Sequence, residues 1–218
     1  MSADGFANAD GGLVVRDLVA AVQANRQALS DIDGAIGDGD HGINMAKGFG
    51  LVGQELEKAP ADLSKGLLIV SRTLMGTIGG AMGPLYGTIF RGMGRACDGV
   101  ERIDAPVFRA MLDGALASVR TVSEAQVGDK TMMDALVPAV HAYGASLDAG
   151  RGFVDSLEAM AVAAEEGRDS TRDLVAKVGR ASRLGERSRG TLDAGATSCA
   201  LILRTIAGSA TSLLNPSA

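Results

Sequence analysis

The sequence predicts an all-α protein with a single domain, and three observations support this. Apolar residues recur at helical spacing in eight segments joined by short connections, and no segment alternates convincingly as a strand would. Aromatic residues make up only 3% of the chain and tryptophan is absent, which suits closely packed helices better than a β-sandwich. The 218 residues, 46% of them hydrophobic, suffice for one sizeable core. We therefore expect residues 1–218 to form one domain without a linker or an internal repeat.

The first four expected helices are delimited by glycine, proline or a capping aspartate. Leu13, Leu18 and Val22 mark the first helix, which ends near Ser30 and leads into an acidic loop. An aspartate is placed to cap the third helix, and a proline is placed at the start of the fourth. These helices are expected over residues 13–30, 42–57, 63–75 and 84–93.

The remaining four expected helices follow the same logic. Asp104-Ala105-Pro106 begins the fifth, and Pro138 lies early enough in the sixth to be tolerated. The seventh helix can be interpreted as broken at Gly167, in which case Asp169 or Ser170 would cap its second part. The four helices are expected over residues 105–122, 133–143, 153–178 and 196–214.

The most unusual stretch is residues 31–42, an acidic and glycine-rich loop. It holds four aspartates, four glycines and His41. Carboxylate oxygens are the ligands that hard divalent cations prefer, and glycine lets backbone N–H groups approach a ligand closely. The sequence therefore predicts a Mg²⁺ loop. Nucleotide phosphates can bind to such a loop, because Mg²⁺ commonly completes its coordination with phosphate oxygens of a substrate.

Three other interpretations of this loop fit less well. Residues 37–42 satisfy G-x-G-x-x-G, but the dinucleotide fingerprint follows a buried strand, and the preceding segment here is helical. Asp38 and Asp40 would also repel a phosphate in the absence of a metal. The calcium-hand pattern requires a final glutamate where this chain has Phe49. A solvated turn is the usual role of an isolated Asp-Gly pair, whereas three clustered aspartates beside His41 favour the metal.

Two further segments are candidates for contact with an anion. The glycine-rich residues 76–83 precede a proline-started helix, whose N-terminus would attract phosphate; a plain turn between helices is an equally good interpretation. Residues 180–190 are dense in arginine, and such a run is usually a solvated face. Beside an acidic metal loop, however, arginines are natural partners of phosphate oxygens.

The composition argues against several classes of function. There are 21 basic and 26 acidic residues, and the resulting net charge of −5 argues against a nucleic-acid partner. Cys97 and Cys199 lie far apart and indicate neither a disulfide nor a zinc site, which fits a reducing cytoplasm. The first residues lack the layout of a signal peptide, and no apolar run approaches the length of a membrane span. We therefore expect a soluble, cytoplasmic protein.

Starting at Asp33, a series of blocks occurs in an order that resembles one known family. The blocks are residues 36–45, 79–87, 128–132, 180–188 and 193–198. Together they are similar to the L subunit of dihydroxyacetone kinase. Several separate blocks in the same order, spread over nearly the whole chain, are far more specific than any one glycine motif.

The resemblance implies an antiparallel eight-helix barrel with a nucleotide at one end and an apolar interior that holds a lipid in some members. It also implies that Asp33, Asp38 and Asp40 bind two Mg²⁺ ions, with Asp31 a nearby helix-end charge. The adenine nucleotide, ADP or ATP, would contact residues from several blocks. These are His41, Asn44, Ala81 and Met82 at the phosphates, Met132 and Ser123 at the adenine, and Arg180, Asp193, Ala194 and Gly195 around the rest of the pocket.

Three of these positions depart from the family. The family usually has serine where this chain has Met82, and methionine has no hydroxyl with which to bond a terminal phosphate. Only the backbone N–H of that turn remains available for the phosphate. Ser123 stands where glycine is usual and Ala194 where proline is usual, so the rim of the adenine pocket is altered as well.

The resemblance implies phosphoryl transfer to dihydroxyacetone that a separate K subunit holds as a covalent adduct on a histidine. In one mode, which a free-standing L chain favours, ADP stays bound and a phosphotransferase-system subunit rephosphorylates it. In the other mode, ATP exchanges freely. The alternatives are a kinase subunit that uses free ATP on another acceptor, such as a four-carbon ketose or a carrier-bound fatty acid, and a non-catalytic ADP-binding regulatory protein. We expect no nucleic-acid or membrane partner, and a homodimer is compatible with the sequence.

Overall fold

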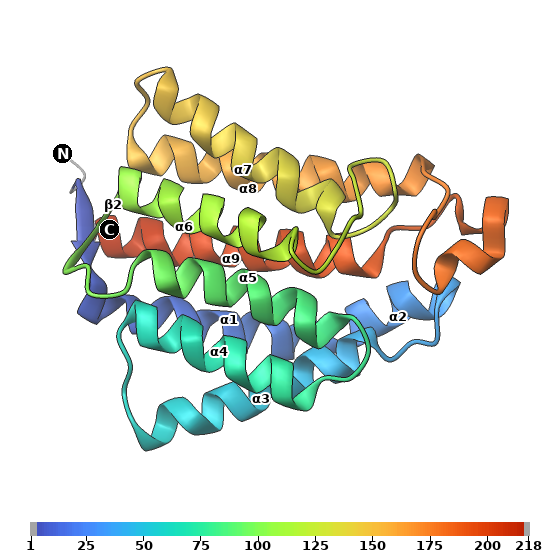
Figure 1. The fold of residues 1–218 in the computed structure, drawn as a ribbon, viewed down its shortest axis with the longest axis horizontal. Coiled ribbons are helices and arrows are strands. Elements are labelled where there is room, and N and C mark those ends of the chain that lie inside the picture. The colour runs from blue at the N-terminus through green and yellow to red at the C-terminus, as the bar shows by residue number, and fades with distance from the viewer. Residues whose placement is uncertain (1–3, 216–218) are drawn as a thin grey trace.

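The computed structural model describes residues 4–215, which form nine α-helices and one small sheet (Figure 1). The prediction of an all-α protein is confirmed. The helices are α1 (Gly12–Ala24), α2 (Arg26–Ile36), α3 (His41–Lys58), α4 (Leu63–Thr77), α5 (Met82–Ala96), α6 (Ala105–Val119), α7 (Met133–Asp148), α8 (Phe153–Ser170) and α9 (Ala194–Leu214). Short 3₁₀ turns add η1 (Asn8–Gly11), η2 (Thr171–Asp173) and η3 (Ala181–Ser188).

The long helices pack side by side with their axes roughly aligned, and from α3 to α9 successive helices alternate in direction (Figure 1). Each of these helices contacts the one before it, α3 also contacts α1, and α9 contacts α1 in turn. The packing partners therefore form a closed circuit. The connections α2–α3, α4–α5, α6–α7 and α8–α9 all lie at the right-hand end of Figure 1. This arrangement gathers four loops that are far apart in the sequence.

The opposite end of the molecule is closed by the sheet and by aromatic packing. β1 (Gly5–Ala7) pairs antiparallel with β2 (Arg102–Asp104), which places Phe6 opposite Ile103. The ring of Phe6 stacks on Phe153 at 6.4 Å between centroids, and Phe153 in turn packs against Phe108. The apolar hollow between Phe6, Phe108 and Met111 at this end has no space for a water molecule. Large buried rings thus hold this end together, while polar and small residues are left for the other.

The first expected helix is divided in two, so the described chain has one helix more than the eight expected. The break falls at Asn25, whose side-chain Nδ2 donates to the carbonyl of Ala21 at 2.9 Å. Asparagine competes in this way for a helical carbonyl and so favours helix ends. The second half of the segment, α2, carries the chain as far as Ile36, so part of the acidic loop is helical.

The seventh expected helix was also placed wrongly, since α8 is not broken at Gly167 and ends at Ser170 rather than near residue 178. Gly167 is a packing residue, because a Cβ there would collide with the carbonyl oxygen of Asp134 in α7. That carbonyl receives no helical hydrogen bond, because the residue four positions later is Pro138, which has no backbone N–H. The small sheet was not expected either, because strands of three residues are too short to show alternation.

Helix α9 meets the length and composition of a membrane span, with 21 residues and a mean hydropathy of 1.3 over its most apolar window. The expectation that no apolar run approaches that length is therefore wrong. However, 56% of that window is buried, and α9 packs against α1, α7 and α8. A helix that is apolar on most sides is also what the centre of a globular fold requires.

Candidate functional site

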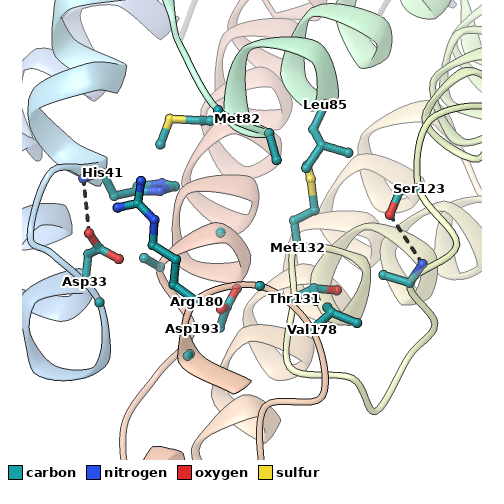
Figure 2. Close-up of a pocket in the computed structure, with 18 of the residues that line it drawn as sticks. Asp33, His41, Met82, Leu85, Ser123, Thr131, Met132, Val178, Arg180 and Asp193 are labelled. Carbon is teal, nitrogen blue, oxygen red and sulfur yellow. Dashed lines mark hydrogen bonds between the residues drawn. The ribbon is translucent and has the colours of Figure 1, made fainter. Parts of the chain in front are cut away.

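The four loops at the right-hand end of Figure 1 surround a cavity of about 710 Å³. The structure places every residue predicted to bind metal or nucleotide in its lining, although these residues come from five different segments. They are Asp33, Asp38, Asp40, His41, Asn44, Ala81, Met82, Ser123, Met132, Arg180, Asp193, Ala194 and Gly195. Figure 2 shows how several of these side chains converge, with Asp33 and His41 on one side and Met132 and Ser123 on the other.

The acidic cluster is formed by Asp33 from the last turn of α2 and by Asp38 and Asp40 from the connection to α3. One carboxylate oxygen of each lies within 4.8 Å of the others. Gly39, with φ of +76°, makes the turn that brings them together. At Gly37, any Cβ would collide with the Asp33 carboxylate. The neighbouring Asp31 instead accepts from Gln27 on the exposed face of α2 at 2.8 Å.

This donor set fits a hard divalent cation. Three carboxylates at this spacing offer oxygen ligands, and the C-terminal end of α2 adds the negative end of a helix dipole. Arg180 from the α8–α9 connection reaches across and forms an ion pair with Asp38. A guanidinium and a candidate cation-binding cluster therefore meet at one point of the cavity, which suits a ligand that carries several negative charges.

Four helices begin at the cavity, and their N-termini point their unpaired N–H groups toward this end of the molecule. The first residues of α3, α5, α7 and α9 are in the lining. The partial positive charge at helix N-termini favours an anion, above all a phosphate group. The Asp33 carboxylate accepts from the backbone N–H of His41 at 3.3 Å, so the acidic cluster and the start of α3 are directly joined.

The imidazole of His41 lies between α3 and α9. Its Nε2 is 2.8 Å from the hydroxyl of Ser198, and that hydroxyl is 2.6 Å from the hydroxyl of Tyr86. Burial lowers the pKa of His41 to about 4, although the Asp33 carboxylate opposes the shift. His41 is therefore neutral near pH 7.

The far side of the cavity is apolar. Leu85, Val122, Met132 and Val178 line it, and Figure 2 shows Met132 extended toward Leu85. The hydroxyl of Ser123 accepts from the backbone N–H of Ala125 at 3.3 Å at its edge. A flat apolar group, such as a nucleotide base, can pack between these side chains, while the charged part of the same ligand reaches the acidic cluster.

Lys130 is a residue of the site that sequence reasoning missed. It is buried, its φ is +62°, and its Nζ donates to the carbonyls of Thr171 and Thr191 at 2.5 and 2.6 Å. A lysine in this conformation is uncommon. Its ammonium fastens both ends of the segment that carries Arg180. Lys130 lies within one of the recognised blocks, but its partners are distant in the sequence.

Asp193 caps the first turn of α9, where its side chain accepts from the N–H of Ala196 at 2.7 Å. Burial raises the pKa of this carboxyl to about 6, while that hydrogen bond and the nearby Lys130 oppose the shift. Tyr86 and Ser198 were likewise missing from the predicted site, although both lie in recognised blocks. Their role depends on contacts between α5 and α9 that no local pattern reveals.

The fold and the cavity define a class: an all-helical protein with a candidate metal cluster and an anion site formed by helix N-termini. A family model described as the DAK2 domain matches residues 35–208, and the chain belongs to that family. The resemblance inferred from the sequence blocks is thereby confirmed.

Two relatives match most of this chain. The ADP-binding subunit of PEP-dependent dihydroxyacetone kinase 1 from Listeria innocua is 41% identical over 189 residues, which are 86% of this chain and 89% of that protein. The ADP-binding subunit of the PEP-dependent dihydroxyacetone kinase from Escherichia coli is 37% identical over 183 residues, 82% of this chain and 86% of that protein.

Two longer proteins match as well. A D-erythrulose kinase from Mycolicibacterium smegmatis is 35% identical over 91% of this chain, which is 36% of its own length. Among solved structures, the dihydroxyacetone kinase of C. freundii in complex with AMP-PNP and Mg²⁺ aligns with a TM-score of 0.67 and 23% identity. The aligned part is 91% of this chain and 33% of the C. freundii chain. At that identity the likeness supports the fold alone.

Proposed function

We propose that this protein is the nucleotide-binding subunit of a dihydroxyacetone kinase. It would hold a Mg²⁺-bound adenine nucleotide and pass its phosphoryl group to dihydroxyacetone held by a separate K subunit. The observation that carries the proposal is that the metal and nucleotide residues expected from separate blocks all line one cavity. Relatives of nearly the same length that are named as ADP-binding subunits support the same function.

Asp33, Asp38 and Asp40 would hold two Mg²⁺ ions, which when bound would draw negative charge from the phosphate oxygens. Arg180 would turn from Asp38 toward a phosphate, because a guanidinium pairs with either anion. His41 and Asn44 would face the phosphates from the first turn of α3.

At the start of α5, Met82 leaves the phosphate to backbone N–H groups. These groups are free at a helix N-terminus whatever the side chain, so a site without the usual serine hydroxyl can still bind phosphate. The adenine would pack on Met132 beside Ser123, and Asp193, Ala194 and Gly195 would close the remaining wall. The charged and apolar halves of the cavity thus correspond to the two halves of a nucleotide.

The second substrate would come from a partner protein. We propose that a K subunit supplies the ketose and that a phosphotransferase-system subunit rephosphorylates ADP in place. Cys97 and Cys199 are buried free thiols, in keeping with a reducing cytoplasm. The relative named D-erythrulose kinase favours one second candidate, a kinase subunit that uses free ATP on a four-carbon ketose.

Reconstitution tests the proposal. Purified protein is mixed with a K subunit and dihydroxyacetone or erythrulose, and product is measured either with phosphoenolpyruvate and phosphotransferase components or with ATP. We expect ADP to copurify and dihydroxyacetone phosphate to form in the first mixture. Transfer only from ATP, or only to erythrulose, would favour the second candidate. ADP binding without transfer in any mixture would indicate a regulatory protein, and absence of ADP binding would contradict both kinase proposals.

A further inference from the structure

Three buried side chains at the wall of the cavity join three of the helices that begin there. Ser198 of α9 lies at the centre and is fully buried. Its hydroxyl is 2.8 Å from His41 Nε2 of α3 and 2.6 Å from the Tyr86 hydroxyl of α5. These contacts connect residues 157 and 112 positions apart in the sequence. The first turns of α3, α5 and α9 are therefore held in one arrangement by a single hydroxyl.

The contacts of Ser198 favour one assignment of its hydrogen over the alternatives. Ser198 has one proton to donate, and its possible acceptors are His41 Nε2 at 2.8 Å, the Ala194 carbonyl at 3.0 Å and the Gly195 carbonyl at 3.2 Å. Hydroxyl donors typically lie about 2.7–2.8 Å from their acceptor, whereas N–H donors lie about 2.9–3.0 Å away. The contact with His41 therefore fits a bond from the serine hydroxyl to an unprotonated Nε2.

The other imidazole nitrogen, Nδ1, is unpartnered within the described residues. His41 Nδ1 makes no hydrogen bond to any residue between 4 and 215. Among the buried side-chain atoms of that range, Ser30 Oγ alone lacks a partner, so Nδ1 is not sealed inside the protein. His41 is a lining residue of the cavity, so a ligand in that space is the partner we assign to this nitrogen.

We propose that Ser198, oriented by Tyr86, is a positioning residue that holds His41 with its proton on Nδ1, so that the imidazole donates a hydrogen bond to a phosphate oxygen of the nucleotide. The phosphate part of this inference rests on the proposed function. The tautomer of an imidazole is set by the partner of its other nitrogen. A proton on Nε2 instead would turn an Nδ1 lone pair toward the anion and weaken its binding.

Tyr86 completes the arrangement. Its hydroxyl lies 2.6 Å from that of Ser198 and 3.1 Å from the Gly195 carbonyl. In the proposed arrangement the shorter contact is the one to which tyrosine donates. Burial raises the pKa of this phenol well above 10, so it keeps its proton. The serine oxygen thus accepts from tyrosine and gives its own proton to histidine. Ser198→Ala removes both functions at once, whereas Tyr86→Phe removes the donor that orients the serine, together with a bond to the Gly195 carbonyl.

Nitrogen NMR of the imidazole tests the tautomer directly and needs no nucleotide. The chain contains two histidines, and the second, His141, is exposed on α7, so ¹⁵N-histidine labelling gives two separable signal sets. We expect His41 in the wild-type protein to be protonated on Nδ1 and the Ser198→Ala variant to lose that preference. A proton on Nε2 in the wild type, or an unchanged pattern in the variant, would overturn the proposal.

Affinity for ADP with Mg²⁺ tests whether Ser198 acts through His41. We expect Ser198→Ala to weaken binding about ten-fold, Tyr86→Phe to weaken it less, and Ser198→Ala to have no further effect in a His41→Ala background. A full loss that persists in that background would show a structural role and overturn the proposal. Ser209→Ala is the matched control, because Ser209 is also buried in α9 and bonds the carbonyl four residues earlier, but its other partner is Asp17, which is outside the cavity lining, rather than His41.

The two proposals can fail separately. Wild-type protein that binds no ADP, yet carries the His41 proton on Nδ1, would contradict the proposed function and leave the hydrogen-bond arrangement standing. Wild-type protein that binds ADP with the proton on Nε2 would contradict the arrangement alone. Should Ser198→Ala fail to fold, the wild-type spectrum and Tyr86→Phe still decide the outcome.

Discussion

Two groups of the cavity, the buried His41 and the half-buried Asp193, are expected to contribute opposite pH dependences to stability. The pKa of His41 falls from 6.5 to about 4, and that of Asp193 rises from 3.8 to about 6. Both shifts follow mainly from burial, which penalises the charged form. As the pH falls below 6.5, an unfolded His41 takes up a proton that the folded protein resists, so stability is lost. As the pH falls through 6, folded Asp193 takes up a proton before the unfolded chain does, so stability is gained.

The magnitudes nearly cancel. Each pKa difference corresponds to about 1.36 kcal/mol per unit, so between about pH 7 and pH 4.5 each group changes the free energy of unfolding by about 2 kcal/mol. Asp193→Asn removes one of the two while an amide oxygen can still cap α9. We expect this variant to lose about 2 kcal/mol more stability than the wild type over that range, and His41→Gln to lose about 2 kcal/mol less.

Urea unfolding followed by circular dichroism, at several pH values without Mg²⁺ or nucleotide, measures these differences. Other carboxylates titrate in every variant, so the informative quantity is each variant's profile relative to the wild type. His141→Gln serves as the control because that histidine is exposed on α7, and its profile should run parallel to the wild type. The reasoning would be refuted if the free energy of unfolding of Asp193→Asn changed in parallel with that of the wild type from about pH 7 to pH 4.5.

Three further substitutions test how the loops are held. Gly42→Ala places a Cβ against the backbone oxygen of Arg26 in α2 and should lower the free energy of unfolding by about 1–3 kcal/mol; unchanged urea stability would contradict that close approach. Lys130→Met leaves two carbonyls without their donor and should cost about 2 kcal/mol and speed proteolysis within residues 171–193. Resistance equal to the wild type would contradict the fastening role. Arg180→Met should weaken ADP binding about ten-fold, whereas Arg183→Met, outside the lining, should not; equal effects would argue against a specific Arg180 contact.

The parts of the site that the sequence predicts are those set by local chemistry. Asp33, Asp38 and Asp40 lie within eight residues, and the glycines among them allow a turn that can bring three carboxylates together. Two helix starts could be predicted from capping aspartates. The side chains of Asp62 and Asp104 each accept a hydrogen bond from the backbone N–H three residues later. The placement of distant blocks around one cavity followed from the family resemblance, and no local pattern would have supplied it.

Most of what the sequence did not predict depends on contacts between distant segments. Lys130 adopts positive φ because its ammonium bonds carbonyls 41 and 61 residues away. Ser198 meets His41 across 157 residues. Helix α1 ends at Asn25 because the side chain of that residue competes for a helical carbonyl. The spacing of apolar residues gives no information about such a hydrogen bond. Periodicity identifies which segments are helical and leaves the loops between them open.

The central claim is that the aspartate cluster holds Mg²⁺ and that Mg²⁺ in turn holds the nucleotide. Isothermal titration of ADP into the wild type, Asp33→Asn and Asp31→Asn, each with Mg²⁺ and with EDTA, tests it most directly. Both substitutions remove one charge from α2, but only Asp33 lines the cavity. The account predicts that EDTA and Asp33→Asn each abolish or severely weaken binding, while Asp31→Asn with Mg²⁺ binds as the wild type does. Equal affinity in all three proteins, with or without Mg²⁺, would contradict it.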